Sequence, residues 1–352
     1  MTQKIEIKSR TIEELKELLA GWGEKPFRAA QLFCWLHEKR VDSYEDMTNL
    51  SKALREKLVE ECSLTKIKEI DRLESVDGTK KFLFELSDGQ AIESVLMKYH
   101  HGNSVCISSQ AGCRMGCRFC ASTLGGLIRN LTASEMLEQI YEIERITGDT
   151  VSNVVVMGTG EPMDNYDNLV RFVRILSAKE GKNISVRNIT VSTCGIVEGM
   201  KRLAEENLPL TLALSLHAPN DEVRKQLMPV ANKYKIEEVL QACDYYYEKT
   251  SRRITYEYSL VEGVNDTAEC AKELAGRLRG KNCHVNLIPV NPIKERNYRK
   301  SREAAIQNFK NILEKNRINC TIRREMGSDI NAACGQLRRS HSSKEGCNRE
   351  EE

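Results

Sequence analysis

From Ser104 onward the chain alternates short runs of β-branched and aliphatic residues with longer amphipathic stretches, and no other feature constrains its fold as strongly. Seven runs fit buried strands: SVCIS from Ser104, NVVVMG from Asn153, NITVST from Asn188, LTLALSLH from Leu210, ITYEYSLV from Ile254, HVNLIPV from His284 and CTIRRE from Cys320. The stretches between them have a helical period, as in Thr132 to Ile146, which opens with the capping pair Thr132 and Glu135. This alternation predicts an α/β fold with a parallel sheet, and six or seven units fit a partial barrel better than a closed eight-unit barrel.

The stretch before this alternation, residues 1–95, has a different pattern. It contains three short helical segments, Ile12 to Ala20, Arg28 to Glu38 and Leu50 to Glu61. A hairpin follows, in which TKKFLFEL and QAIESVLM flank SDG. We therefore expect a small N-terminal accessory domain, helical with a hairpin, over residues 1–95 and the main domain over residues 96–340. Residues 341–352 are polar without an apolar period, and we expect a disordered tail there.

Composition excludes several classes of protein. No window approaches the roughly 18 consecutive apolar residues that a membrane helix needs. The start, MTQKIEIKSRTIEELKELL, is charged throughout and does not fit a secretory signal, so we expect a cytoplasmic protein without a membrane partner. Thirteen cysteines in 352 residues are too few for a disulfide scaffold. The thiols are therefore expected to be metal ligands, catalytic groups or small core residues.

Three of these cysteines lie close together in SSQAGCRMGCRFCAS, directly after the first strand of the main domain. Cys113, Cys117 and Cys120 have the spacing CxxxCxxC. A structural zinc site normally has four ligands, and neither a second CxxC pair nor a nearby histidine completes one in the sequence. Three thiolates instead suit a four-iron, four-sulfur cluster with one iron left open. A zinc site, or a chance group of cysteines, remains the alternative.

This spacing resembles that of the radical S-adenosylmethionine superfamily, as does the aromatic Phe119 directly before the third cysteine. The loop GTGEP, Gly158 to Pro162, follows the run NVVVMG and resembles the GGE-type loop that contacts the amino group of the cofactor in that superfamily. The resemblance implies a partial (β/α)6 barrel and a 4Fe–4S cluster. It also implies cleavage of S-adenosylmethionine, bound at the open iron, to a 5′-deoxyadenosyl radical.

Nearly the whole chain, from about Lys25 to Leu337, resembles the RlmN/Cfr family of RNA methyltransferases. The matching stretches are SVCISSQAGCRMGCRFCAST, VVVMGTGEPMDNYDN, ITVSTCGI, LALSLHAPN, HVNLIPVNP and SDINAACGQLR. The resemblance implies cluster ligands at Cys113, Cys117 and Cys120, and cofactor contacts at Gly160, Glu161, Ser192, Ser215, Leu216, His217 and Asn291. It also implies a methyl-carrying Cys334, a resolving Cys106 that ends in a disulfide with it, and a proton acceptor at Glu93. Thr159 departs from the apolar residue common in the family and leaves Gly160 and Glu161 intact.

Without the resemblance, several of these residues carry weaker signals. Cys106 fits a small buried residue of a strand, and Glu93 fits an exposed strand carboxylate. Cys334 stands between Ala333 and Gly335 in a segment with little to bury, which suits an accessible nucleophile. His217 ends a strand run, where a barrel places functional side chains, although a capping or core role suits it equally.

The resemblance implies methylation of adenosine at C2, in the peptidyl-transferase region of 23S ribosomal RNA and in transfer RNA next to the anticodon. It implies two S-adenosylmethionine molecules per turnover, one as methyl donor and one as radical source, and a low-potential electron donor such as flavodoxin or ferredoxin. One alternative is the C8 methylation of Cfr-type enzymes, which Pro162 disfavours because Cfr-like sequences tend to have Ala after the glutamate. A non-catalytic RNA-binding protein with a structural metal is the other.

Local charge indicates where RNA would bind, because the net charge of +2 gives no global signal. Between Asn291 and Ser340 there are twelve Lys or Arg and five Asp or Glu residues, with Tyr298 among them as a stacking surface. Such an excess suits phosphate contacts. A solvated helix face is the alternative for residues 310–317. The accessory segment KPFRAAQLFCWLHEKR is also compatible with RNA binding.

Overall fold

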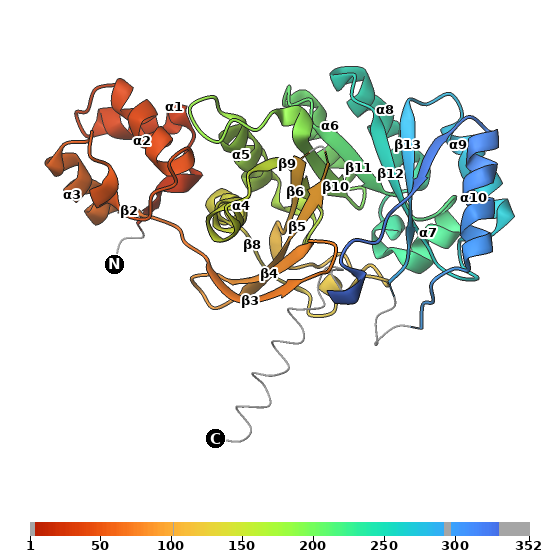
Figure 1. Cartoon of the computed structure of the whole chain (residues 1–352). Coiled ribbons are helices and arrows are strands. Elements are labelled where there is room, and N and C mark those ends of the chain that lie inside the picture. Colours follow the sequence, from red (N-terminus) through yellow and green to blue (C-terminus); the bar gives the residue numbers. More distant parts are fainter. Residues whose placement is uncertain (1–3, 101, 292–296, 331–352) are drawn as a thin grey trace.

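The computed structural model describes residues 4–100, 102–291 and 297–330, and its centre is one ten-stranded sheet (Figure 1). Seven strands are parallel and neighbour one another in chain order: β6 (Gly102–Ile107), β9 (Val151–Val156), β10 (Ile189–Thr193), β11 (Thr211–Ser215), β12 (Ile254–Leu260), β13 (Cys283–Pro289) and β14 (Asn319–Ile322). Each strand falls on one of the seven runs expected from the sequence. The sheet is open within the described chain, because β14 and β3 (Lys68–Glu74) are its two ends. The α/β class and the partial (β/α)6 barrel are thus confirmed.

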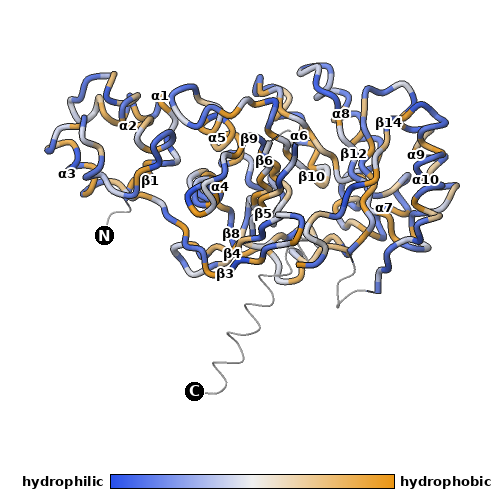
Figure 2. Tube along the Cα trace, in the orientation of Figure 1, coloured by the Kyte–Doolittle hydropathy of each residue, from blue (hydrophilic) through white to orange (hydrophobic). Residues whose placement is uncertain are grey.

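Helices follow the parallel strands and build the hydrophobic core with them (Figure 2). They are α4 (Ala133–Thr147) after β6, α5 (Tyr166–Ser177) after β9, α6 (Val197–Glu205) after β10, α7 (Asp221–Leu227) and α8 (Ile236–Thr250) after β11, α9 (Ala268–Leu278) after β12 and α10 (Glu303–Lys315) after β13. The expected capping pair opens α4, since the Glu135 amide donates to Thr132 Oγ1 and the Thr132 amide donates to Glu135 Oε2. Local capping therefore sets where this helix begins.

Alternation along the parallel strands divides the sheet into an apolar face and a polar face. Val105, Val154 and Leu212 are fully buried in the core that includes the helices. The opposite face carries a polar row across four strands, in which the register aligns Ser215, Glu257, Asn286 and Thr321. The described helices pack in the core with the apolar face, so the polar face is the one suited to a polar ligand.

Three antiparallel strands extend the sheet beyond β6. They are β3, β4 (Lys80–Glu85) and β5 (Ala91–Tyr99), and the hairpin expected from the sequence is β4 with β5. β5 pairs directly with β6, so the hairpin belongs to the same sheet as the parallel strands. The expected domain boundary near residue 95 lies inside β5 and stays a prediction.

The helical N-terminal unit packs beside α4 at one end of the molecule (Figure 1). It comprises α1 (Ile12–Gly21), α2 (Phe27–His37) and α3 (Lys52–Glu61), with β1 (Ile5–Glu6) parallel to β2 (Cys62–Ser63). Lys8 Nζ donates to Glu138 Oε1 at 2.7 Å, and both side chains are buried. His37 Nδ1 lies 3.1 Å from the Tyr141 hydroxyl. Two buried polar contacts thus fix this unit to α4.

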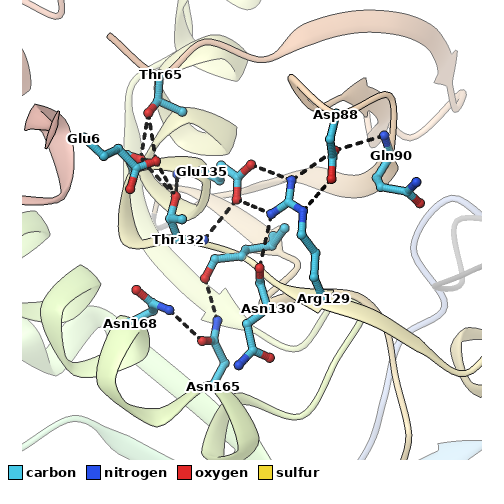
Figure 3. Close-up of polar contacts among 12 residues, drawn as sticks. Glu6, Thr65, Asp88, Gln90, Arg129, Asn130, Thr132, Glu135, Asn165 and Asn168 are labelled. Atoms are coloured by element: carbon cyan, nitrogen blue, oxygen red, sulfur yellow. Dashed lines mark hydrogen bonds and ion pairs between the residues drawn. The ribbon is translucent and has the colours of Figure 1, made fainter. Parts of the chain in front are cut away.

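A short hairpin that the sequence did not indicate encloses the cysteine loop. Its strands are β7 (Gln110–Gly112) and β8 (Leu127–Asn130). Arg129 of β8 pairs with Asp88 in the β4–β5 turn at 2.6 Å and with Glu135 of α4 at 2.8 Å (Figure 3). The base of the cysteine loop is therefore tied both to the antiparallel extension and to the first helix of the barrel.

Candidate functional site

The cysteine loop leaves the sheet through a neck that requires glycine. Gly112 has φ +84°, and a Cβ there would lie 2.1 Å from the carbonyl oxygen of Gly126. Directly after it, the Cys113 amide donates to the same oxygen at 2.8 Å. The absence of a side chain at Gly112 lets the two ends of the loop approach each other.

The three thiols of this loop lie within electrostatic range of one another. Cys113 is buried, whereas Cys117 and Cys120 are half-buried. Burial is the main cause that raises the pKa of Cys113 to about 12, and the nearby Cys120 adds to it. Burial also raises the pKa of Cys117, followed by the charges of Cys120 and Cys113. Three thiolates would therefore repel one another here unless a cationic group lay between them.

The donor set of this loop is three thiols, the ligand type that holds iron–sulfur clusters in proteins. A cluster of four irons and four sulfides is a larger body, so its thiolate ligands stand farther apart than the ligands of one ion. Its positive irons would also offset the repulsion among the thiolates. Cys113, Cys117 and Cys120 thus fit an iron–sulfur cluster.

The GTGEP loop lies directly against the strand that leads into the cysteines. Gly160 has φ +112°, and a Cβ there would meet Gln110 Cβ at 2.6 Å. The Glu161 amide donates to Gln110 Oε1 at 2.8 Å. The Glu161 carboxylate is buried and accepts from the amides of Met163 at 3.1 Å and Cys194 at 2.7 Å. Burial, partly offset by these hydrogen bonds, raises the pKa of Glu161.

The carboxyl ends of β10 and β11 bring together the next group of expected cofactor contacts. Ser192 Oγ and Ser215 Oγ are 3.3 Å apart and half-buried on the polar face. Beyond them the amides of Leu216 and His217 both donate to the carbonyl oxygen of Glu257, at 3.0 and 3.2 Å. The hydroxyls of Ser192 and Ser215 therefore lie at the carboxyl ends of parallel strands, where such a sheet usually binds its ligand.

His217 is a buried, neutral imidazole. Its Nδ1 accepts a hydrogen bond from the Ser259 amide at 2.9 Å, and its φ is +56°. Burial, and secondly the charge of Arg224, lowers its pKa to about 3. The Phe119 ring meets the His217 ring edge-on with centroids 4.8 Å apart, so the aromatic residue beside Cys120 anchors the cysteine loop to the end of β11.

Sequence reasoning missed Arg224, a fully buried residue of α7. Its Nη2 donates to the carbonyl oxygen of Cys194 at 2.6 Å and its Nε to that of Leu216 at 3.3 Å. It therefore joins the segments that follow β10 and β11. An arginine on a short helix offers no local signal of burial, because such residues usually face solvent.

Glu93 and Cys106 share the polar face on neighbouring strands β5 and β6. Cys106 lies opposite Val95 in the register, and Glu93 is two residues before Val95. The expectation of an exposed strand carboxylate is wrong, since Glu93 is 3% exposed and pairs with Lys81 at 3.0 Å. Cys106 is buried beside Met97, as expected of a strand residue.

The remaining expected residues are less informative. Asn291 is exposed just after β13. Cys334 lies outside the described residues. In the basic stretch, Lys300 pairs with Glu325 at 2.5 Å and Arg302 with Glu262 at 3.1 Å. Other basic residues are exposed and present positive charge, namely Arg299, Arg323 and Arg324, whereas Lys294 and Arg296 are outside the described residues.

Two family models match separate parts of this architecture. Residues 107–275 match the radical SAM superfamily, and residues 5–64 match the ribosomal RNA large subunit methyltransferase N-terminal domain. The chain is also 68% identical over 345 residues to the probable dual-specificity RNA methyltransferase RlmN of Lachnoclostridium phytofermentans, covering 98% of this chain and 97% of the relative. The chain belongs to the RlmN family.

A second relative and one solved structure agree with this assignment. The probable dual-specificity RNA methyltransferase RlmN of Lachnospira eligens is 62% identical, covering 96% of each chain. The crystal structure of a radical SAM methyltransferase from Sphaerobacter thermophilus superposes with a TM-score of 0.88 at 44% identity, covering 94% of this chain and 98% of that one. The protein is therefore a radical SAM RNA methyltransferase, and enzymes of this superfamily use a 4Fe–4S cluster and S-adenosylmethionine.

Among the helices that the structure describes, none has the length and hydropathy that a membrane span requires.

Proposed function

We propose that this enzyme methylates C2 of adenosine, in 23S ribosomal RNA near the peptidyl-transferase region and in transfer RNA next to the anticodon. The observation that carries the proposal is that Glu93 and Cys106 share one face of adjacent strands, just before the cysteine loop. A buried carboxylate and a buried thiol on the same face of neighbouring strands suit a reaction that must remove a proton and then break a bond to sulfur. Ribosomal and transfer RNA meet in the cytoplasm, where we expect the enzyme to act.

The target atom explains why a radical enzyme is needed. C2 of adenine lies between two ring nitrogens and is electron-poor, so it does not attack a methyl group as a nucleophile. When bound, the cluster and S-adenosylmethionine supply a 5′-deoxyadenosyl radical. Cys113, Cys117 and Cys120 would hold the cluster, and Gly160, Glu161, Ser192, Ser215, Leu216, His217 and Asn291 would line the cofactor site. Two S-adenosylmethionine molecules serve each turnover, one as methyl donor and one as radical source, with a flavodoxin or ferredoxin as reductant.

The protein's own residues divide the remaining work. Cys334 carries the methyl group as a thioether. This methyl gives one hydrogen atom to the 5′-deoxyadenosyl radical, and its carbon then joins C2. The adduct gives one electron back to the oxidised flavodoxin or ferredoxin, and Glu93 then accepts the C2 proton. The Cys106 thiolate then attacks the sulfur of Cys334, so that an S–S bond forms and the C–S bond breaks. The electron pair of that bond goes to the carbon, which takes up a proton from solvent to complete the methyl group. The methylated base is released and a disulfide remains, which must be reduced before the next turnover.

RNA contact is supported by exposed charge close to the expected methyl-carrying segment. Arg323 and Arg324 follow β14 and are exposed, and Arg299 is exposed after β13. Each phosphate contact made by such a residue makes the affinity for RNA fall more steeply as the salt concentration rises. A base has to leave its stack to reach the face of a sheet, so a loop adenosine is a better substrate than one in a duplex.

The test is to map the modified nucleotide by mass spectrometry after anaerobic reconstitution with iron, sulfide, S-adenosylmethionine and reductant. We expect 2-methyladenosine in both RNAs and formation of 5′-deoxyadenosine. Methylation at C8 would replace the proposal with the Cfr-type activity. A protein that binds RNA and zinc but forms no 5′-deoxyadenosine would overturn the catalytic proposal altogether.

A further inference from the structure

Lys81 is a fully buried lysine on the ten-stranded sheet, and lysine is rarely buried in proteins. It belongs to β4, its side chain is fully buried, and its Nζ lies 3.0 Å from Oε2 of Glu93 on β5. Charges taken out of water are unfavourable unless an opposite charge compensates them. Each charge of this pair compensates the other.

The strand register aligns the pair with Cys106. Lys81 lies opposite Val95, and Val95 lies opposite Cys106 on β6. Glu93 precedes Val95 by two residues, so its side chain leaves the same face of the sheet as those of Lys81 and Cys106. The Ser108 hydroxyl also donates to the carbonyl oxygen of Glu93 at 2.7 Å, which fixes the backbone of β5 at this residue.

We propose that Lys81 is a positioning residue that holds the Glu93 carboxylate directed toward the target base. The proposal rests on the role of Glu93 as proton acceptor in the proposed function. The Lys81 ammonium lies 3.0 Å from Oε2 of Glu93, so it fixes one carboxylate oxygen and with it the orientation of the carboxylate.

The same charge also acts after the proton transfer. When Glu93 accepts the C2 proton, the electron pair of the C–H bond returns to the ring and the carboxylate becomes a neutral acid. Lys81 then stays charged beside a neutral group in a buried site, which is unfavourable. It therefore promotes release of that proton from Glu93 to solvent after the methylated RNA leaves, and the ion pair re-forms.

The test follows the covalent protein–RNA adduct on denaturing gels with the full-length, cluster-loaded enzyme. Lys81→Met removes the charge at similar length, so we expect turnover to fall about 100-fold and the adduct to accumulate as in Glu93→Gln. Lys81→Arg keeps the charge and should restore turnover without adduct. Lys8→Met is the matched control, because Lys8 and Glu138 form an equally buried pair at 2.7 Å that lies against the N-terminal unit. It should lower the free energy of unfolding without trapping adduct.

The outcomes separate this proposal from the proposed function. If Glu93→Gln and Cys106→Ala trap the adduct but folded Lys81→Met turns over normally, or loses turnover without adduct, the positioning role is overturned. If neither Glu93→Gln nor Cys106→Ala traps adduct, the proposed function fails and takes the role of Lys81 with it. Lys81→Met/Glu93→Gln should trap no more adduct than Glu93→Gln alone, and an additive effect would contradict action through Glu93. Should Lys81→Met fail to fold, Lys81→Gln in the same comparison decides the matter.

Discussion

Asp329 binds Ser75 across the open sheet. The Ser75 hydroxyl donates to Asp329 Oδ1 at 2.5 Å, and the Val76 amide donates to Oδ2 at 3.2 Å. Two residues earlier, the Gly327 amide donates to Asp77 Oδ2 at 3.0 Å. The chain just before the segment that carries Cys334 is therefore held on the turn between β3 and β4, next to the strand that carries Lys81.

We predict that Asp329→Ala releases this tether. The bond from Ser75, and secondly the one from Val76, lowers the pKa of Asp329, so the tether is present at neutral pH and is lost as pH falls through the lowered pKa. Hydrogen exchange of the Val76 amide should become faster in Asp329→Ala. Asp77→Ala is the control, because it should speed exchange at Gly327 instead. Unchanged protection of Val76 would contradict the prediction.

Gly112→Ala should disrupt the cysteine loop. The added Cβ would meet the Gly126 carbonyl at 2.1 Å, at a φ of +84° that disfavours side chains. We expect a loss of about 1–3 kcal/mol in stability and reduced iron content after reconstitution. Gly125→Ala is the matched control, because nothing lies within 4 Å of a Cβ there. Full iron loading of Gly112→Ala would show that the neck tolerates a side chain.

Replacing any one of Cys113, Cys117 and Cys120 with alanine should abolish formation of 5′-deoxyadenosine and lower the iron content. The loop packs against a small buried cluster that includes Leu227 and Met228 and lies outside the main core of strands and helices, so the circular dichroism of all three variants should resemble that of the parent. Cys270→Ala is the control. It removes a half-buried thiol of α9 and should keep full iron content and activity. Cleavage of S-adenosylmethionine by all three loop variants would refute the ligand assignment.

Cys106 and Cys334 should differ in what their variants accumulate. Cys334→Ala has no sulfur to carry the methyl group, so its RNA should be recovered free and unmodified. Cys106→Ala permits every step up to the adduct and lacks only the thiolate that releases it, so a covalent protein–RNA species should build up. Denaturing gels of both variants purified from cells measure this. An adduct with Cys334→Ala, or none with cluster-loaded Cys106→Ala, would reverse or remove these roles.

His217 should make the folded state sensitive to acid. Its pKa is about 3 in the folded protein against the ordinary value of 6.5, so below about pH 6.5 the unfolded state binds a proton that the folded state does not. As pH decreases below about 6.5, this residue should lower the free energy of unfolding by up to about 1.4 kcal/mol per pH unit. In urea unfolding between about pH 7 and about pH 5, His217→Gln should flatten that fall. His37 is also buried with a pKa of about 3, so His37→Gln should flatten the fall independently. An unchanged slope in both His217→Gln and His37→Gln would contradict the assignment.

Much of the site could be predicted from the sequence because its signals are local. The spacing of Cys113, Cys117 and Cys120 and the GTGEP motif depend on residues within a single loop. The seven strands and the capping box at Thr132 and Glu135 depend equally on short-range patterns of side chains. Local hydrogen bonds and periodic hydrophobicity act over a few residues, so the linear order of residues already contains them.

Only the tertiary structure decided which charged residues are buried. Glu93 looked like an exposed carboxylate and Arg224 carried no signal, yet both are buried where strands and helices distant in sequence meet. A buried charge needs an opposite charge that compensates it, and Lys81 on the neighbouring strand supplies one to Glu93. That pairing exists because β3, β4 and β5 continue the barrel sheet in one particular register. Register and sheet order arise from contacts between distant segments, which no local pattern specifies.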